Sequence, residues 1–450
     1  MGEKLKIYRN LARCFFILYD NVTNRKVWAC KNYLEKTQWL KKRDIERLQI
    51  KKLRALLRHA YTNVAYYRKA FRNVGARPED VHLLEDLSKV PIVSRSDVRK
   101  YSSSMIAENV SRRHLVLQLT SGTTASPIGV YRSKEDLSWG VGAELRAYGW
   151  AGYEVGDRQA LIWLIRPDDK RSFKFKVRNL LLRNRILDVN FLSEKSMESF
   201  ARALCNFKPE FIRGYPASVS IFATFILNNH YLAIRPKAVF TSGQTLFQNY
   251  RGVIEKALKC KVYDYYASTE MSHIAAQCGQ HDGLHVTDEN IIVEVVKDEE
   301  VAARGEEGKV LLTNLNNYAM PLIRYDIGDL ATVLDDECSC GRGLSLLKPF
   351  GRTYEYFQNS DGSFTCLRDF QTVFEDLPIR DFQIIQESFD EILIKIVAEP
   401  GYTKAHTEFI LKNIKSSGNA DVKIELADSL PLGTSGKVQH VISKLKTKYT

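Results

Sequence analysis

The spacing of apolar residues changes along the chain from a helical to a strand-like period. Between Arg43 and Arg72, apolar residues recur every three or four positions, with lysines and arginines opposite. The preceding stretch, residues 8–40, mixes aromatic and basic residues, and we expect it to form helices that lie on a surface. Residues 1–75 are therefore predicted to be a helical lead-in.

From Gln159 onward, short apolar runs alternate with helical stretches. The predicted strands are 160–165, 211–213, 238–240, 261–263, 291–296 and 310–313, and the predicted helices are 196–206, 217–228 and 250–258. This alternation predicts an α/β domain with buried strands. Short β runs and turns around Gly328 and Gly341 predict a β-rich subdomain attached to it.

A boundary is predicted near Gly351–Phe357. Beyond it, residues 382–387, 391–398 and 422–426 are typical of strands, and residues 403–416 are typical of a helix. A chain of 450 residues is too long for one compact core. We therefore expect an α/β protein with a large N-terminal domain, residues 1–352, and a small mobile α+β domain, residues 353–450.

Composition and charge narrow the class of protein. Hydrophobic residues make up 44% and charged residues 26%, a balance that argues against disorder. No apolar run is long enough to cross a bilayer and no secretory signal is evident, so we expect a cytoplasmic protein. Contact with the inner face of the membrane is the alternative.

The chain is basic, with 66 Lys and Arg against 53 Asp and Glu and a net charge of +13. The excess favours polyanionic partners, or it is a solvated basic surface. The run Arg166–Arg185 is either a solvated loop or a binding surface for a phosphorylated acceptor or a membrane. Because no recognition helix, zinc-finger spacing or RNA-binding aromatic motif is present, we expect no specific nucleic-acid partner.

A loop suited to phosphate is formed by Thr120-Ser121-Gly122-Thr123-Thr124. Hydroxyl side chains and backbone N–H groups around a glycine can surround phosphate oxygens. Taken alone, the motif also fits a polar turn. The later segments decide between these interpretations.

Two further polar segments each follow an apolar run, where α/β proteins bind ligands. They are Ser242-Gly243-Gln244 and Tyr265-Tyr266-Ala267-Ser268-Thr269-Glu270. The second offers aromatic faces for a base and a carboxylate for Mg²⁺. At a later turn, Asp329 is suited to accept both hydroxyls of a ribose. Near the C-terminus, Lys437 lies on a glycine-containing loop, where its charge can neutralise an α-phosphate under attack.

In this order, the five segments resemble the core motifs of the adenylate-forming superfamily of acyl-CoA synthetases and adenylation domains. Residues 59–68 and Arg213-Gly214-Tyr215-Pro216 resemble the phenylacetate–CoA ligase branch, which includes ligase-like proteins of capsule and surface-polysaccharide synthesis. The resemblance runs from about residue 50 to the end of the chain.

The resemblance implies a role for each segment. Thr120–Thr124 would be the phosphate loop, and Ser242–Gln244 with Tyr265–Thr269 would frame the adenine and the acyl site. Glu270 would hold Mg²⁺, Asp329 with Arg352 of the hinge region would hold the ribose, and Lys437 would be the adenylation lysine. Thr269, Glu270 and Lys437 are the predicted catalytic residues.

The implied activity is ATP-dependent formation of an acyl-AMP with loss of pyrophosphate, followed by acyl transfer to coenzyme A. The alternative acceptor is an amine or hydroxyl of a surface-polysaccharide precursor. Ala125 and Gln244 depart from the family pattern and raise the further alternative of an inactive scaffold, against which the retained Lys437 argues. No motif names the carboxylic acid.

Cys278-x-x-His281 and Cys338-x-Cys340 offer four ligands for tetrahedral zinc. The alternative is a set of unrelated thiols, because C-x-C is a short pattern. Relatives in the resembling branch are similar in having Cys/His sets here, which favours structural zinc. His285 competes with His281 for the place of the histidine ligand, or lines the acyl pocket.

Overall fold

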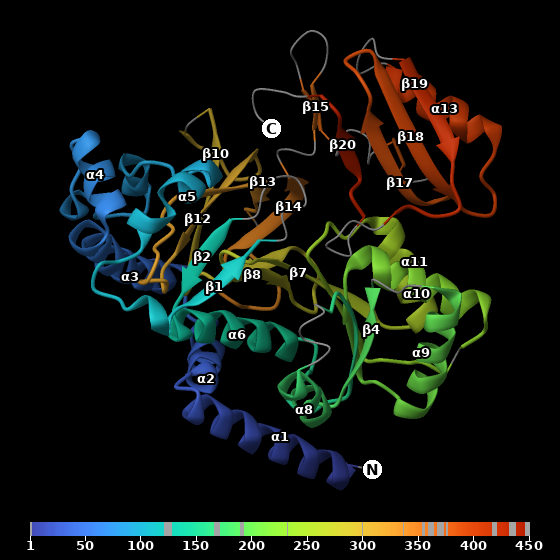
Figure 1. The fold of residues 1–450 in the computed structure, drawn as a ribbon, viewed down its shortest axis with the longest axis horizontal. Coiled ribbons are helices and arrows are strands. Elements are labelled where there is room, and N and C mark those ends of the chain that lie inside the picture. Colours follow the sequence, from blue (N-terminus) through green and yellow to red (C-terminus); the bar gives the residue numbers. More distant parts are fainter. Residues whose placement is uncertain are drawn as a thin grey trace.

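A mixed sheet of twelve strands forms the centre of the large domain (Figure 1). Its order is β11-β10-β12-β13-β14-β9-β8-β7-β6-β5-β3-β4. The computed structural model describes residues 2–120, 128–165, 172–189, 193–231, 233–298, 300–335, 337–352, 356–358, 364–366, 373–374, 377–415, 421–431 and 438–445.

One half of the sheet is parallel, as the alternation of strands and helices predicts. Its strands are β3 (Gln159–Trp163), β4 (Asn184–Asp188), β5 (Phe211–Gly214), β6 (Ala238–Ser242) and β7 (Lys261–Ser268). The helices on one face are α9 (Glu194–Phe207), α10 (Pro216–Asn228) and α11 (Gln248–Leu258). They bury an apolar core that includes Phe222, Ile226 and Ile254, all fully buried.

The opposite face of this half is covered by α6 (Lys134–Gly149). Outside α6 lie α2 (Val27–Thr37) and α1 (Gly2–Val22), which Figure 1 shows below it. Arg9 of α1 forms an ion pair of 2.7 Å with the fully buried side chain of Asp157. The predicted surface helices therefore exist, and α1 is held to the domain by charge as well as by packing.

The other half of the sheet is antiparallel and β-rich, as predicted. It consists of β8 (Ser272–Gln277), β9 (Leu284–Val286), β10 (Ile291–Lys297), β11 (Glu300–Val301), β12 (Glu307–Asn314), β13 (Tyr325–Val333) and β14 (Leu346–Arg352). The other elements of this half are α3 (Lys42–Asn63), α4 (Ala65–Asn73), α5 (Arg95–Tyr101), the 3₁₀ turns Pro78–Asp80, Glu85–Lys89, Ser102–Met105 and Arg112–His114, and the hairpin β1 (Val116–Leu119)–β2 (Gly129–Arg132).

The single helix predicted over residues 43–72 is two helices, α3 and α4. Val64 between them is fully buried and has an extended backbone, with φ −122° and ψ 111°. This extended residue ends α3 and precedes α4, so the helix that the apolar spacing predicts is interrupted there.

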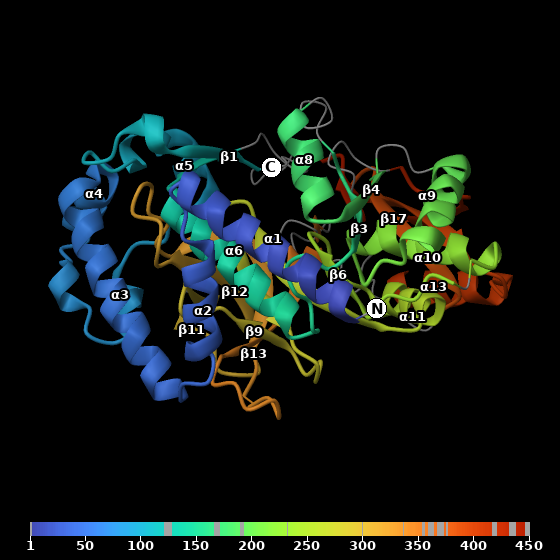
Figure 2. The same cartoon turned by 90° about the horizontal axis from the view of Figure 1, so that it is seen from below.

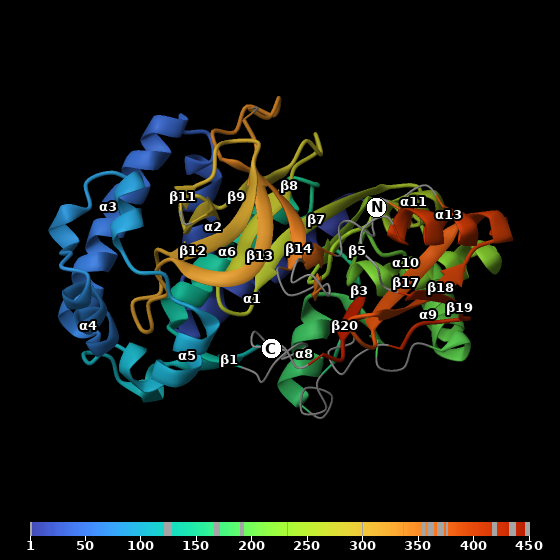
Figure 3. The ribbon, with the colours of Figure 1, turned by 90° about the horizontal axis from the view of Figure 1, so that it is seen from above.

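The C-terminal unit is a four-stranded sheet with one helix. Its order is β19 (Asp421–Leu426), β18 (Glu391–Ala398), β17 (Ile379–Gln386) and β20 (Val441–Ser443), with α13 (Lys404–Lys415) packed on it. A two-stranded pair, β15 (Tyr356–Gln358) and β16 (Phe364–Cys366), precedes it. Figure 3 shows the unit over the end of α10 and α11, where Tyr250 of α11 donates a hydrogen bond of 2.6 Å to buried Asp381.

The basic run forms regular structure where it is described. Residues 173–181 are helix α8 (Phe173–Leu181), and Arg185 lies in β4. Residues 166–171 lie outside the described part of the chain. None of the described helices combines the length and the apolar character that a membrane span requires.

Candidate active site

Two of the predicted segments meet where the parallel strands end. Ser242 is the last residue of β6 and pairs with Tyr265 of β7. Gly243 follows with a φ of +82°, a left-handed conformation that favours glycine and turns the chain out of the sheet. Ligands of open α/β sheets bind at these carboxyl ends. Ser242–Gln244 and the end of β7 are thus placed together at the expected edge.

The residues predicted for adenine and ribose are in contact. The Tyr266 hydroxyl donates a short hydrogen bond to the Asp329 carboxylate. Asp329 pairs in turn with Arg352 across β13 and β14, although the side chain of Arg352 lies outside the described part. An aromatic ring and a carboxylate suited to a nucleoside therefore lie next to each other.

The predicted magnesium ligand is buried behind this pair. Glu270 is 5% exposed, and its Oε1 accepts a hydrogen bond of 3.2 Å from the Tyr325 hydroxyl. The turn before it is held by Ser268, whose Oγ accepts from the N–H of Met271 at 3.1 Å. The Tyr325 hydroxyl therefore holds the Glu270 carboxylate, and Ser268 stabilises the turn that carries it.

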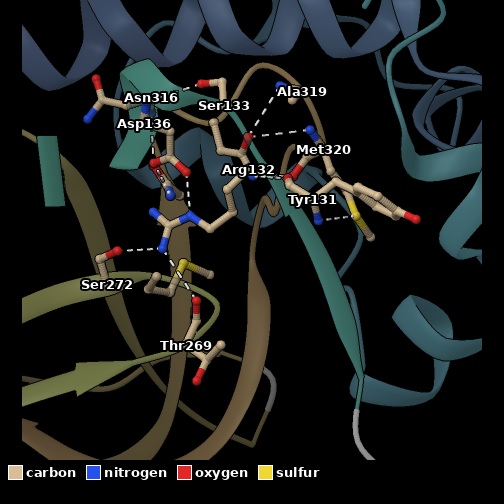
Figure 4. Close-up of polar contacts among 12 residues, drawn as sticks. Tyr131, Arg132, Ser133, Asp136, Thr269, Ser272, Asn316, Ala319 and Met320 are labelled. Carbon is tan, nitrogen blue, oxygen red and sulfur yellow. Dashed lines mark hydrogen bonds and ion pairs between the residues drawn. The ribbon is translucent and has the colours of Figure 1, made fainter. Parts of the chain in front are cut away.

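An arginine that sequence reasoning missed holds this turn to the phosphate-loop hairpin (Figure 4). Arg132, in β2, donates to the Thr269 carbonyl at 3.3 Å and makes a short hydrogen bond to Ser272. Its Nε lies 2.5 Å from the carboxylate of Asp136, and both side chains are almost completely buried. The sequence did contain a hint of this ion pair, because Arg132 and Asp136 are four residues apart at the start of a helix.

The base of the predicted phosphate loop is closed by Thr120. Its N–H donates to the Ile128 carbonyl, its Oγ1 accepts from the Ile128 N–H, both at 3.0 Å, and Arg95 donates to the same Oγ1 at 3.1 Å. Ser121, Gly122, Thr123 and Thr124 lie outside the described residues. Their role remains a prediction.

Gln244 connects the site to the C-terminal unit. Its Nε2 donates a hydrogen bond of 3.3 Å to the main-chain carbonyl of Val438. Glutamate is common at this position in the resembling family, but a carboxylate cannot donate to a carbonyl. Lys437, the residue before Val438 in the sequence, lies outside the described residues.

A second feature that sequence reasoning missed is a polar cluster between α6 and the sheet. Glu144 Oε1 lies 2.6 Å from Nη2 of Arg213 and accepts from the Tyr148 hydroxyl at 2.7 Å. The Arg213 Nε donates to the Tyr265 hydroxyl at 3.0 Å, and its guanidinium lies 5.3 Å from the centre of the Trp163 ring. Arg213 belongs to the quoted Arg-Gly-Tyr-Pro segment, but no sequence signal paired it with Glu144.

The cysteines come together with a different histidine from the one predicted. Ligand atoms of Cys278, Cys338, Cys340 and His285 all lie within 4.8 Å of one another. The Cys278 and Cys338 sulfurs are 3.6 Å apart, and Cys340 Sγ is 3.3 Å from His285 Nε2. Zn–S bonds of about 2.3 Å in a tetrahedron place two sulfurs about 3.8 Å apart, so the set fits zinc.

His281 lies elsewhere, which corrects the predicted ligand set. It has a φ of +63° at the turn after β8, and its Nδ1 lies 3.4 Å from Gln277 Oε1. Its ring packs against Tyr263, with the ring centres 4.8 Å apart. His281 is not among the side chains gathered with the cysteines, whereas β9 places His285 among them.

Comparison with known proteins agrees with this architecture. Residues 357–444 match the CapK C-terminal domain family. Protein CapK of Staphylococcus aureus is 21% identical over 437 residues, which cover 92% of this chain and 93% of that protein. The phenylacetate–coenzyme A ligase of Pseudomonas putida is 28% identical over 300 residues, 64% of this chain and 66% of that protein.

Among solved structures, 2-hydroxyisobutyryl-CoA ligase in its post-adenylation state with 2-HIB-AMP superposes with a TM-score of 0.73. The two chains are 21% identical, and the match covers 89% of each. The chain is therefore a relative of CapK and of phenylacetate–CoA ligases, and its fold is that of the adenylate-forming CoA ligases.

Proposed function

We propose that this protein is an ATP-dependent carboxylate-activating ligase that forms an acyl-AMP, releases pyrophosphate and passes the acyl group to coenzyme A. The observation that carries the proposal is the contact between Tyr266 and Asp329 beside the ends of β6 and β7. The relatives named phenylacetate–coenzyme A ligases support the same activity.

In this proposal each segment acts on a different part of ATP. Tyr266 stacks on the adenine, and the Asp329 carboxylate accepts hydrogen bonds from the ribose hydroxyls in place of the Tyr266 hydroxyl. Thr120–Thr124 donate to phosphate oxygens. Glu270 offers the hard oxygen ligand that Mg²⁺ prefers, and Mg²⁺ neutralises phosphate charge.

The carboxylate of the acid attacks the α-phosphorus of ATP, forming the acyl–O–P bond while pyrophosphate leaves with the electron pair of the broken P–O bond. Lys437 would neutralise the charge that develops in this step. The Gln244–Val438 hydrogen bond supports this role, because it holds the neighbouring residue of the lysine against the site.

The direct test is exchange of labelled pyrophosphate into ATP with a panel of aryl, fatty, hydroxy and amino acids and Mg²⁺. We expect exchange that depends on at least one acid, because adenylation is reversible. Absence of exchange with every class of acid would contradict the proposed activity and favour the inactive scaffold.

We also propose a structural zinc ion, separate from the active site, that is held by Cys278, Cys338, Cys340 and His285. The four groups come from the turn after β8, from β9 and from the loop before β14, so the ion would fasten three parts of the antiparallel half. The ligands Cys278 and Cys338 belong to a separate small core with Leu346, so the ion would have a structural role.

The acceptor is proposed to carry phosphate. Coenzyme A is the leading candidate, and a hydroxyl or amine of a nucleotide- or lipid-linked sugar precursor is the second, because the sequence also resembles ligase-like proteins of surface-polysaccharide synthesis. Lys176 and Arg178 are exposed on α8, and Arg183 lies 4.6 Å from the ring centre of Tyr8 in α1. Figure 2 shows α8 beside α1, so both contribute to one basic side that suits an anionic acceptor or a membrane surface.

Replacing Lys174, Lys176 and Arg178 together by alanine is expected to lower the rate of transfer to coenzyme A by roughly tenfold at low salt, because exposed charges steer anions. Pyrophosphate exchange should change little. Salt should reproduce the effect, since exposed charges are screened over about 8–10 Å. A variant that is unchanged in both half-reactions, with no salt effect on transfer, would leave the basic run without this role.

A further inference from the structure

The Glu144–Arg213 cluster bears on which acids the proposed ligase accepts. Arg213 is the penultimate residue of β5, and Trp163 is the last residue of β3. Tyr265 pairs with Ser242 at the end of β6. The cluster thus lies at the same edge of the sheet as the nucleotide residues, on the side that α6 covers. Because α6 follows the phosphate-loop hairpin directly, this is where an acid bound beside the α-phosphate would extend its tail.

The ion pair is only partly enclosed. The side chains of Arg213 and Glu144 are 27% and 24% exposed, although Tyr148 and Tyr265 beside them are buried. Within the described part of the chain, no hydrogen-bond partner meets Nη1 of Arg213 or Oε2 of Glu144. Each partner therefore keeps one polar atom available at the edge where the ligand binds.

The cluster carries no net charge. The Arg213 cation is matched by the Glu144 anion, and burial raises the pKa of both Tyr148 and Tyr265, so that their hydroxyls stay protonated. A substrate tail with an ammonium or a second carboxylate would add an uncompensated charge to a partly buried site. An alkyl or aryl tail would cover the available polar atoms and leave them without hydrogen bonds.

We propose that the carboxylic acid carries a neutral hydroxyl group, which donates to Glu144 and accepts from Arg213. This inference rests on the proposed function, since it assigns the acid that is adenylated. It makes Glu144 and Arg213 the residues that determine substrate specificity.

The test compares acids that differ in one group, by pyrophosphate exchange with the full chain. The probes are 2-, 3- and 4-hydroxybutyrate against butyrate, succinate, 4-aminobutyrate and phenylacetate. We expect at least one hydroxybutyrate to exceed butyrate by roughly 10²-fold in kcat/KM, because a site built to bond a hydroxyl rejects analogues without it. Succinate, 4-aminobutyrate and phenylacetate should be poorer than that hydroxybutyrate.

Two variants assign the preference to the cluster. In Glu144→Gln and Arg213→Met, the hydroxybutyrate-to-butyrate ratio should fall below tenfold through a higher KM for the hydroxy acid, with the KM for ATP unchanged. Glu154→Gln is the matched control, because Glu154 also pairs with an arginine, Arg9, but is 62% exposed and remote from the strand ends. A change in the KM for ATP, or a lowered thermal unfolding temperature with an unchanged ratio, would reduce the pair to a structural role and overturn the inference.

The outcomes separate the two proposals. Exchange that is as fast with butyrate, phenylacetate, succinate or 4-aminobutyrate as with every hydroxybutyrate overturns the inference and leaves the ligase standing. If neither these acids nor the wider panel supports pyrophosphate exchange, then the proposed ligase activity is contradicted.

Discussion

Replacing Lys437 by alanine is expected to slow acid-dependent pyrophosphate exchange by about 10²-fold or more. The reason is loss of a cation at the phosphate where charge develops during attack. Transfer of the acyl group from preformed acyl-AMP to coenzyme A should decline much less, because that step does not involve the ATP α-phosphate. Both half-reactions are measured on the same preparation.

Lys444→Ala is the control for this change. Lys444 is an exposed lysine of the same small unit, paired with Glu387, and lies only seven positions along the chain. It should leave both half-reactions intact. An equal loss of exchange and transfer in Lys437→Ala would refute the division of labour that we assign to the lysine.

Replacing His285 by alanine is expected to remove zinc, whereas His281→Ala should retain it. Freshly purified protein should contain one zinc per chain by elemental analysis. His285→Ala and Cys338→Ser should lose most of it and unfold several degrees lower, because a structural metal contributes folding free energy directly. The specific activity of the folded fraction should change much less than the unfolding temperature does, because the zinc ligands are not in the active site.

Cys205→Ser is the control for thiol removal, since Cys205 is partly buried on the opposite face of the sheet, in the α9 core. Its metal content and unfolding temperature should match those of the parent. If the parent protein contains no zinc, the proposed zinc site is wrong. If His285→Ala retains zinc and His281→Ala loses it, the ligand is His281, as the sequence predicted.

The sequence predicted the layered α/β fold because its buried parallel strands are uninterrupted apolar runs separated by amphipathic helices. It could not predict the division at Val64, since the apolar spacing on either side continues the same helix face. The break itself is an extended backbone at Val64, which no local pattern in the sequence reports.

The site shows the same limit. Tyr266 and Asp329 were predicted because each lies in a local motif, and the sheet brings them into contact. Arg213 and Glu144 are 69 positions apart on a strand and a helix, so only the packing of α6 on the sheet pairs them. His281 was preferred over His285 on its spacing from Cys278, although the fold gathers His285, on β9, with the three cysteines.

The most direct measurement of the central claim follows oxygen from the acid. The acid that supports exchange is labelled with ¹⁸O in its carboxylate and incubated with ATP, Mg²⁺, coenzyme A and the full chain. If the carboxylate attacks the α-phosphorus, then the AMP released after acyl transfer carries one ¹⁸O, and pyrophosphate carries none. Label in inorganic phosphate, with ADP as the nucleotide product, would show activation at the γ-phosphate and contradict acyl-AMP formation.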